Sequence, residues 1–238
     1  MSFGRPRHHY RRTDSTNRRA RELVEAGAPS GTVVTADEQT AGRGRRGRAW
    51  SAPAGKALLY SAVLRRLDAR HALLPLAVPL AACEAIESVA PVRCALKWPN
   101  DVWIEQRKAA GILIESRPPE WAVIGIGVNV AIDPGEFPPE LRWPATSIGH
   151  GASVEGTLAA LNDALAAWVD ASPERVDAAY RDRDALRGRA MSWEDGPPGI
   201  ERGRGTADGI DDRGDLVVDT EGGARVTLGA GEVQLKLG

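Results

Sequence analysis

The sequence predicts an α+β fold, in which a mixed β-sheet is flanked by helices and followed by a small C-terminal β-barrel. Short apolar runs such as residues 122–130 show little polar alternation, which indicates strands buried on both faces. A sheet of such strands must be covered by helices. Beyond Gly188 the chain is rich in glycine and turn pairs between brief strands, which is typical of a small barrel. We therefore expect two domains, residues 1–187 and 188–238.

The first predicted helix covers residues 14–26. Asp14 or Ser15 can cap its first turn, Gly27 can end it, and its first backbone amides can face a ligand. The polar, glycine-punctuated segment 37–48 is predicted to be a loop.

A second helix is predicted over residues 69–89, where Pro75 and Pro79 require a late start or a bend. Two more helices are expected over residues 157–170 and 173–187. Strands are predicted over residues 32–36, 58–64, 92–97, 102–105, 111–115 and 122–130, and in the small domain over 216–219 and 224–228.

Length and composition suit an ordinary globular protein. The 238 residues are 42% hydrophobic and 26% charged, which is enough to bury a sizeable core. The longest apolar run, residues 73–83, is far shorter than the roughly 20 residues of a membrane helix, and the basic N-terminus lacks the apolar stretch of a secretory signal. Cys83 and Cys94 are too few for a disulfide framework. We expect a soluble, cytoplasmic protein without membrane contact.

Charge is distributed unevenly behind a net value of −1. Residues 1–21 hold seven arginines against one acidic residue, and residues 42–48 hold four arginines and no acid. An anionic ligand is therefore expected near the first half of the chain. Two of the four lysines, Lys97 and Lys108, lie inside apolar segments where a charge is costly unless it is paired, which indicates that at least one is functional.

The glycine- and arginine-rich run GRGRRGR, residues 42–48, can bend its backbone amides and guanidinium groups around an anion. The same composition suits a solvated basic loop or a nucleic-acid contact. The run alone leaves these three interpretations open.

Motifs that follow one another along the chain resemble, in sequence and in order, those of biotin–protein ligases. They are DSTN (14–17), QTAGRGRRGRAW (39–50), KWPND (97–101), RKAAGILIE (107–115), GIGVNV (125–130) and ATS (145–147). At the C-terminus, GTADGIDDRGDLVV (205–218) and GEV (231–233) resemble the small SH3-like domain of that family. The resemblance covers nearly the whole chain.

The resemblance implies a catalytic domain related to those of class II aminoacyl-tRNA synthetases. It also implies ATP as cosubstrate, with Mg²⁺ bound mainly through the ATP phosphates rather than at a certain protein site. Biotin would be activated as biotinyl-5′-AMP and transferred to a lysine of the biotin carboxyl carrier domain of a biotin-dependent carboxylase. Some members carry an N-terminal DNA-binding domain, but 13 residues precede Asp14, too few for a helix-turn-helix, so no DNA binding is expected.

Site roles are implied residue by residue. Lys108 would lie between the biotin carboxylate and the α-phosphate, with Arg45 and Arg48 as phosphate contacts and Asp101 as a candidate base for the acceptor amine. The biotin-binding set would be Ser15, Thr16, Asn17, Gln39, Gly42, Arg43, Lys108 and Gly111. The nucleotide-binding set would be Arg45, Arg48, Trp50, Lys97 and Asn129, with Trp50 stacking on adenine.

The Arg/Gly loop, residues 42–48, is expected to be mobile when empty and to shield the mixed anhydride from water when closed. Three alternatives remain, and one of them is a purely structural or regulatory protein, which would form no adenylate. A lipoate or octanoate ligase or transferase shares the catalytic fold and a key lysine, and a nucleic-acid-binding module would use the arginine-rich segments. An exposed edge strand of the main sheet could pair with a second copy of the chain, as a possible homodimer, or with the acceptor.

Overall fold

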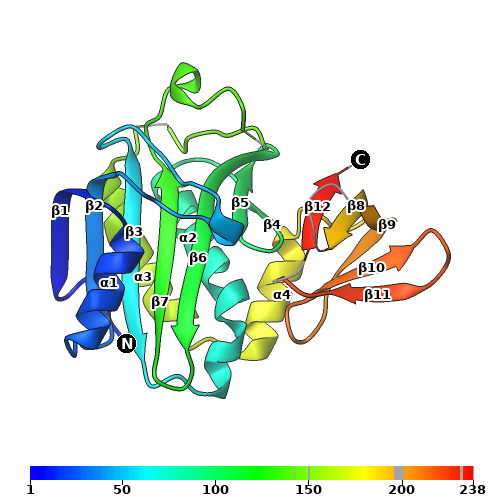
Figure 1. Ribbon diagram of the computed structural model, residues 1–238, viewed down its shortest axis with the longest axis horizontal. Coiled ribbons are helices and arrows are strands. Elements are labelled where there is room, and N and C mark those ends of the chain that lie inside the picture. Colours follow the sequence, from blue (N-terminus) through cyan, green and yellow to red (C-terminus); the bar gives the residue numbers. More distant parts are fainter. Residues whose placement is uncertain (142, 150, 196–200, 231–232, 238) are drawn as a thin grey trace.

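The computed structural model describes residues 1–238 except 142, 150, 196–200, 231, 232 and 238. A seven-stranded sheet with the order β1-β2-β3-β7-β6-β5-β4 forms the larger part of the molecule, and a five-stranded sheet with the order β11-β10-β9-β8-β12 forms the smaller part (Figure 1). In the large sheet β1 and β2 are parallel and the other neighbours are antiparallel, so the sheet is mixed as predicted.

The strands of the large sheet are β1 (Arg7–Thr13), β2 (Val33–Gln39), β3 (Ala57–Arg65), β4 (Ala95–Lys97), β5 (Asp101–Ile104), β6 (Arg107–Arg117) and β7 (Trp121–Asn129). The helices are α1 (Thr16–Glu25), α2 (Leu74–Val89), α3 (Val154–Trp168) and α4 (Pro173–Arg183), with short 3₁₀ turns η1 (Arg45–Gly47), η2 (Ala69–Leu73) and η3 (Pro134–Glu136). The small sheet holds β8 (Ala190–Asp195), β9 (Glu201–Ile210), β10 (Leu216–Thr220), β11 (Arg225–Leu228) and β12 (Val233–Leu237).

Helices cover the large sheet on two sides, which explains its continuous apolar strands. Successive side chains of β3 alternate between the two faces. Leu58 and Tyr60 join the main core beneath α2 and α3, while Val63 joins a smaller cluster beneath α1. All of β3 except Arg65 is therefore buried. The burial on both faces predicted for residues 122–130 is confirmed in β7, where every residue from Ala122 to Asn129 except Gly127 is buried, whereas in β6 most of residues 111–115 are half-buried.

The proline-rich start of the second predicted helix behaves as expected. Residues 69–73 form a 3₁₀ turn, and α2 begins at Leu74 with Pro75 in its first turn, where a missing backbone N–H costs nothing. By length and composition alone the stretch Ala69–Val89 could cross a membrane, but 61% of its 18-residue apolar window is buried inside the protein. It is a core helix.

The first strand is a correction to the sequence-based interpretation, which placed no element before residue 14. Residues 7–13 pair in parallel with β2 at the edge of the sheet. Their sequence, RHHYRRT, has no apolar alternation because most of its side chains are exposed or half-buried. Charged residues are common on edge strands, where they oppose further pairing. A smaller correction is that the helix predicted over 173–187 ends at Arg183.

The small C-terminal sheet starts at Ala190 and contains both strands predicted there, as β10 and β11. It joins the large part through the side chain of Trp98, whose indole Nε1 donates to the carbonyl of Gly214 at 3.0 Å. Of the C-terminal motif GEV, Gly231 and Glu232 lie outside the described residues.

Candidate active site

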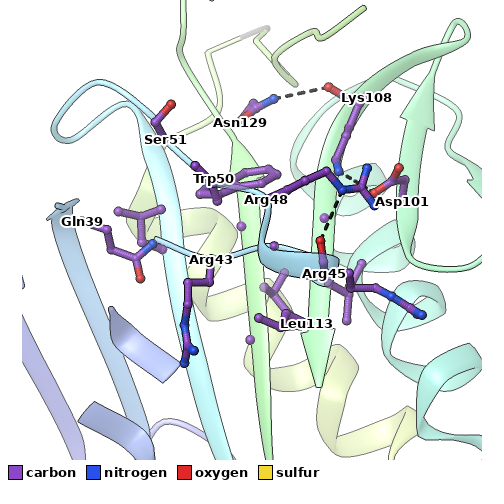
Figure 2. Close-up of a pocket in the computed structure, with 18 of the residues that line it drawn as sticks. Gln39, Arg43, Arg45, Arg48, Trp50, Ser51, Asp101, Lys108, Leu113 and Asn129 are labelled. Carbon is purple, nitrogen blue, oxygen red and sulfur yellow. Dashed lines mark hydrogen bonds and ion pairs between the residues drawn. The ribbon is translucent and has the colours of Figure 1, made fainter. Parts of the chain in front are cut away.

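A pocket of about 370 Å³ opens over β6 and β7 and is flanked by the Arg/Gly loop and the start of α1 (Figure 2). Figure 2 shows Gln39 on one side of the pocket and Lys108 with Asp101 on the other. The lining therefore changes from neutral polar groups to charged groups along its length.

Twelve of the fourteen residues predicted for the site lie in the wall of this pocket. These twelve are Ser15, Thr16, Asn17, Gln39, Arg43, Arg45, Arg48, Trp50, Asp101, Lys108, Gly111 and Asn129. The other two, Gly42 and Lys97, lie behind the wall. A Cβ added to Gly42 would collide with the backbone carbonyl of Trp50 and come within 2.8 Å of the Gln39 Nε2 atom, so only glycine fits there.

The Lys108 ammonium lies 2.5 Å from the Oδ1 atom of Asp101, while the Lys97 ammonium lies 3.9 Å from the Oδ2 atom of the same carboxylate. Asp101 is 5% exposed, so its charge needs this compensation. Lys97 is buried as well, 4.8 Å from the centre of the Trp143 ring. Lys108 is thus the lysine that faces the pocket, and Lys97 supports the carboxylate from behind.

The backbone around Lys108 is fixed by the segment that contains the ATS motif. The Lys108 N–H donates to the Pro144 carbonyl at 2.7 Å, and the Thr146 N–H donates to the Lys108 carbonyl at 2.9 Å. Asn129 then donates its side-chain Nδ2 to the carbonyls of Lys108 and Thr146, at 3.3 and 3.1 Å (Figure 2). Its Oδ1 atom remains for a ligand.

Trp50 lies on the glycines of two neighbouring strands. A Cβ on Gly127 would collide with the indole, and one on Gly111 would come within 2.9 Å of the indole and 3.1 Å of the Lys108 Nζ. The space above Gly111 is thus occupied by Trp50 and Lys108. Because the Lys108 ammonium is 5.4 Å from the Trp50 ring centre, Trp50 borders the charged part of the pocket.

The neutral part of the pocket is a closed hydrogen-bond network at the start of α1. Ser15 is at the helix N-cap but its side chain makes no cap hydrogen bond, and Gln39 Oε1 accepts from the backbone N–H of Thr16 at 2.7 Å. Asn17 is 5% exposed and its amide is bonded on both sides, to Ser61 and to Glu115. Asn17 therefore shapes the end of the pocket.

The Arg/Gly loop is a short hairpin in this structure and makes more contacts than its composition suggests. Gly44 N–H donates to the Arg48 carbonyl at 2.7 Å and Trp50 N–H donates to the Gly42 carbonyl at 2.9 Å. Figure 2 shows Arg48 extending across the pocket toward Lys108 and Asp101, whereas Arg43 points away from them.

Arg45 connects the loop to the small C-terminal sheet. Its guanidinium donates to the carbonyl of Ala230, and its own carbonyl accepts from the Arg48 Nε at 3.2 Å. Burial lowers the pKa of Arg45, as do the charges of Arg48 and Arg46, while Asp101 opposes them. A half-buried guanidinium among like charges is stabilised by a nearby anion.

One wall of the pocket went unnoticed in the sequence. The segment after η3 places Phe137, Leu141 and Trp143 beside the charged part of the pocket. The available signal was the aromatic and proline residues of EFPPE (136–140) and of WP (143–144), which lie between the motifs GIGVNV and ATS. Such a run is also what an ordinary surface loop would show.

Comparisons with known proteins agree with this arrangement. Residues 9–129 match the Biotin/lipoate A/B protein ligase family, and residues 202–236 match the Biotin protein ligase C terminal domain. The chain is 36% identical over 236 residues to the Biotin--[acetyl-CoA-carboxylase] ligase of Mycobacterium tuberculosis, which covers 93% of this chain and 85% of that protein. It is 41% identical over 145 residues to the Bifunctional ligase/repressor BirA of Bacillus subtilis, but this match spans 44% of that protein.

The fold has a close counterpart in a biotin protein ligase from Aquifex aeolicus, solved in complex with biotin and ATP. The TM-score is 0.82 at 26% identity, over 98% of this chain and 100% of that one. A mixed sheet with this pocket and a small C-terminal sheet is the arrangement of a ligase, as the matches to the two ligase models show. The chain belongs to the Biotin/lipoate A/B protein ligase family, and within it to the biotin protein ligases.

Proposed function

We propose that this protein activates biotin with ATP as biotinyl-5′-AMP and transfers it to a lysine of the biotin carboxyl carrier domain of a carboxylase. The observation that carries this proposal is the division of the pocket lining. Its neutral polar side suits a ureido ring, and its other side places Lys108 beside arginines of the Arg/Gly loop, which suits a carboxylate and phosphates. We also propose a domain boundary at residues 187/188 and a cytoplasmic location.

In the first step a biotin carboxylate oxygen attacks the α-phosphorus of ATP, and the bond from that phosphorus to the pyrophosphate oxygen breaks. Two anions must approach each other, so fixed positive charge between them lowers the barrier. Lys108 supplies this charge between carboxylate and phosphate, and Arg45 and Arg48 supply it along the phosphates. Lys97 contributes indirectly, because its ammonium lies beside the Asp101 carboxylate. Trp50 and Asn129 contact the adenylate.

Mg²⁺ would accompany ATP on its phosphate oxygens. The part of the chain that the structure describes holds no group of three or more His, Cys, Asp or Glu side chains placed to bind a metal ion. The pocket does offer the carboxylate of Asp101 and the Oδ1 of Asn129 as oxygen ligands. The cation would screen the phosphate charge, and the residues of the pocket would orient the nucleotide.

In the second step the acceptor amine attacks the acyl carbon of the anhydride, and the bond from that carbon to the AMP oxygen breaks. The amine must lose a proton, and we assign Asp101 as its acceptor. The Asp101 carboxylate lines the pocket beside two ammonium groups, where an incoming amine can come within hydrogen-bond reach of it.

The proposed function is tested by transfer to a purified biotin carboxyl carrier domain. With ATP and biotin, mass spectrometry should show one biotinyl addition at the carrier lysine. Lipoate and octanoate, the substrates of the sister ligases, should add nothing in parallel reactions. Modification by lipoate or octanoate but not biotin would reassign the substrate, and no modification by any acid would contradict ligase activity.

A further inference from the structure

Glu115 is a carboxylate behind Asn17, outside the pocket lining, that none of the steps above uses. It lies near the end of β6, opposite Val123 of β7, and its side chain is 23% exposed. Its Oε2 accepts from the Asn17 Nδ2 at 2.8 Å, and its Oε1 lies 3.3 Å from the Arg43 guanidinium and 3.6 Å from that of Arg21. One carboxylate thus links β6, α1 and the Arg/Gly loop.

The Asn17 amide has one orientation that fits its neighbours. Its NH₂ group faces Glu115 and, at 3.3 Å, the Leu113 carbonyl, and its Oδ1 lies 2.6 Å from the Ser61 hydroxyl. Rotating the amide by half a turn would place its oxygen against the Glu115 carboxylate, and two acceptors repel. The absence of a side chain on Gly125 leaves the amide this position, because a Cβ there would collide with the Asn17 Oδ1.

The orientation of the Asn17 amide determines which oxygen accepts from the Ser61 hydroxyl and which accepts from the Thr16 hydroxyl. Ser61 lies 2.6 Å from Asn17 and 2.8 Å from the Thr16 hydroxyl, which is 3.1 Å from the Gln39 Oε1. Two hydroxyl protons serve these three contacts. Because Asn17 Oδ1 has no proton to give, Ser61 must donate to it, and Ser61 can then only accept from Thr16. The longest contact, Thr16 to Gln39, is left without a proton.

We propose that Glu115 is a positioning residue that fixes the direction of this hydrogen-bond chain, so that Thr16 presents an acceptor, and not a donor, to a ureido N–H of biotin. The inference rests on the proposed function and names a residue that sets its selectivity. It assigns Glu115 no contact with substrate. A site built to accept from an N–H rejects an analogue that lacks it, because the two acceptors then face each other.

The test compares binding of biotin with that of its two cyclic carbamate analogues, in each of which one ureido N–H is replaced by oxygen. Isothermal titration without ATP gives the Kd values for the full chain. Wild type should bind biotin more tightly than at least one analogue. In Glu115→Ala that preference should fall about 10-fold, because the Asn17 amide can rotate and Thr16 can then donate its hydroxyl proton. The Leu113 carbonyl still accepts from the Asn17 NH₂ group, so part of the preference should remain.

Two further variants separate this role from a simple ion pair with Arg43. Glu115→Gln keeps an acceptor for Asn17 but loses the charge, so the preference should stay within about twofold of wild type. Ser61→Ala breaks the chain at another point and should also lower the preference. Glu120→Ala, at a carboxylate of the same hairpin that pairs with Arg117 at 3.5 Å, is the matched control and should change nothing.

An equal loss of preference in Glu115→Ala and Glu115→Gln would overturn the proposal, as would a uniform weakening of biotin and both analogues. If Glu115→Ala does not fold, Ser61→Ala decides by the same criterion. Failure of the proposed function has a different signature, since wild type itself would then bind neither biotin nor the analogues.

Discussion

The Lys108 ammonium lies 2.5 Å from the Asp101 carboxylate, in the wall of a pocket lined by three arginines of the Arg/Gly loop. Without substrate each charge is satisfied by the other. When anionic substrates draw Lys108 toward them, Asp101 would keep its contact with Lys97 and could then accept a hydrogen bond from the incoming amine. The pair therefore connects the two steps of the proposed reaction.

Substitution of Asp101 should affect the two steps unequally. We expect Asp101→Ala to slow transfer from preformed biotinyl-adenylate about 100-fold and adenylate formation by much less, because general-base catalysis contributes in this range. Single-turnover transfer to the carrier domain, compared with pyrophosphate exchange, measures the two steps separately. An equal loss in both would remove the base role.

Arg45 should help to retain the reactive intermediate. Arg45→Gly removes the contact between the Arg/Gly loop and the Ala230 carbonyl, so we expect release of free biotinyl-adenylate and biotinylation of bystander lysines. Incubation with serum albumin and a blot for biotin measures this. Arg46→Gly is the matched control, since Arg46 is exposed and already has the positive φ of 57° that glycine adopts readily. The same labelling by both variants would contradict a specific role for Arg45.

Gly127 provides the space for Trp50. A Cβ at this position would collide with the indole, so Gly127→Ala should displace Trp50, raise the ATP KM about 10-fold and destabilise the fold by about 1–3 kcal/mol. Substrate titrations and thermal melts measure both effects. A Cβ on Gly135 would meet nothing within 4 Å, so Gly135→Ala serves as the control. Wild-type kinetics in Gly127→Ala would show that the position of Trp50 does not matter.

The Glu87–Arg183 pair should stabilise the fold in a pH-dependent way. Burial alone would raise the pKa of Glu87. The hydrogen bonds from Arg183, at 2.6 and 2.8 Å, act together with one from the Cys94 N–H and with the charges of Arg183 and Arg93, and their sum lowers the pKa. A lowered pKa gives stability that is complete above the ordinary glutamate value, about 4.3, and is lost as the pH falls through the folded-state pKa.

We therefore expect Arg183→Met to lower the free energy of unfolding by about 1–3 kcal/mol at pH 7, and by less near pH 3. Urea unfolding at the two pH values tests this prediction. A constant difference would mean that the effect comes from packing rather than from the ion pair.

Sequence alone predicted most of the main sheet and its helices because their signals are local. Apolar runs identified β3 and β7, and the prolines of the second predicted helix indicated a late start or a bend, of which the structure has the late start, at Leu74. The edge strand β1 was missed because RHHYRRT is held by backbone pairing with β2 and not by apolar side chains.

At the site, the motifs identified residues but not their contacts. Asn17 was expected to bind biotin, yet its amide is bonded to Ser61 and Glu115, which are 44 and 98 residues away along the chain. The register of β6 with β7 and the packing of α1 bring these residues together, and no local pattern encodes that. For the same reason Trp143 could not be assigned to the pocket wall.

The most direct test of the central claim is biotin-dependent exchange of labelled pyrophosphate into ATP, measured for wild type and Lys108→Ala. We predict exchange by wild type with biotin but not with lipoate or octanoate. Lys108→Ala should lose about 100-fold or more, because it removes the charge at the junction of carboxylate and phosphate. Undiminished exchange in the Lys108→Ala variant would contradict the account.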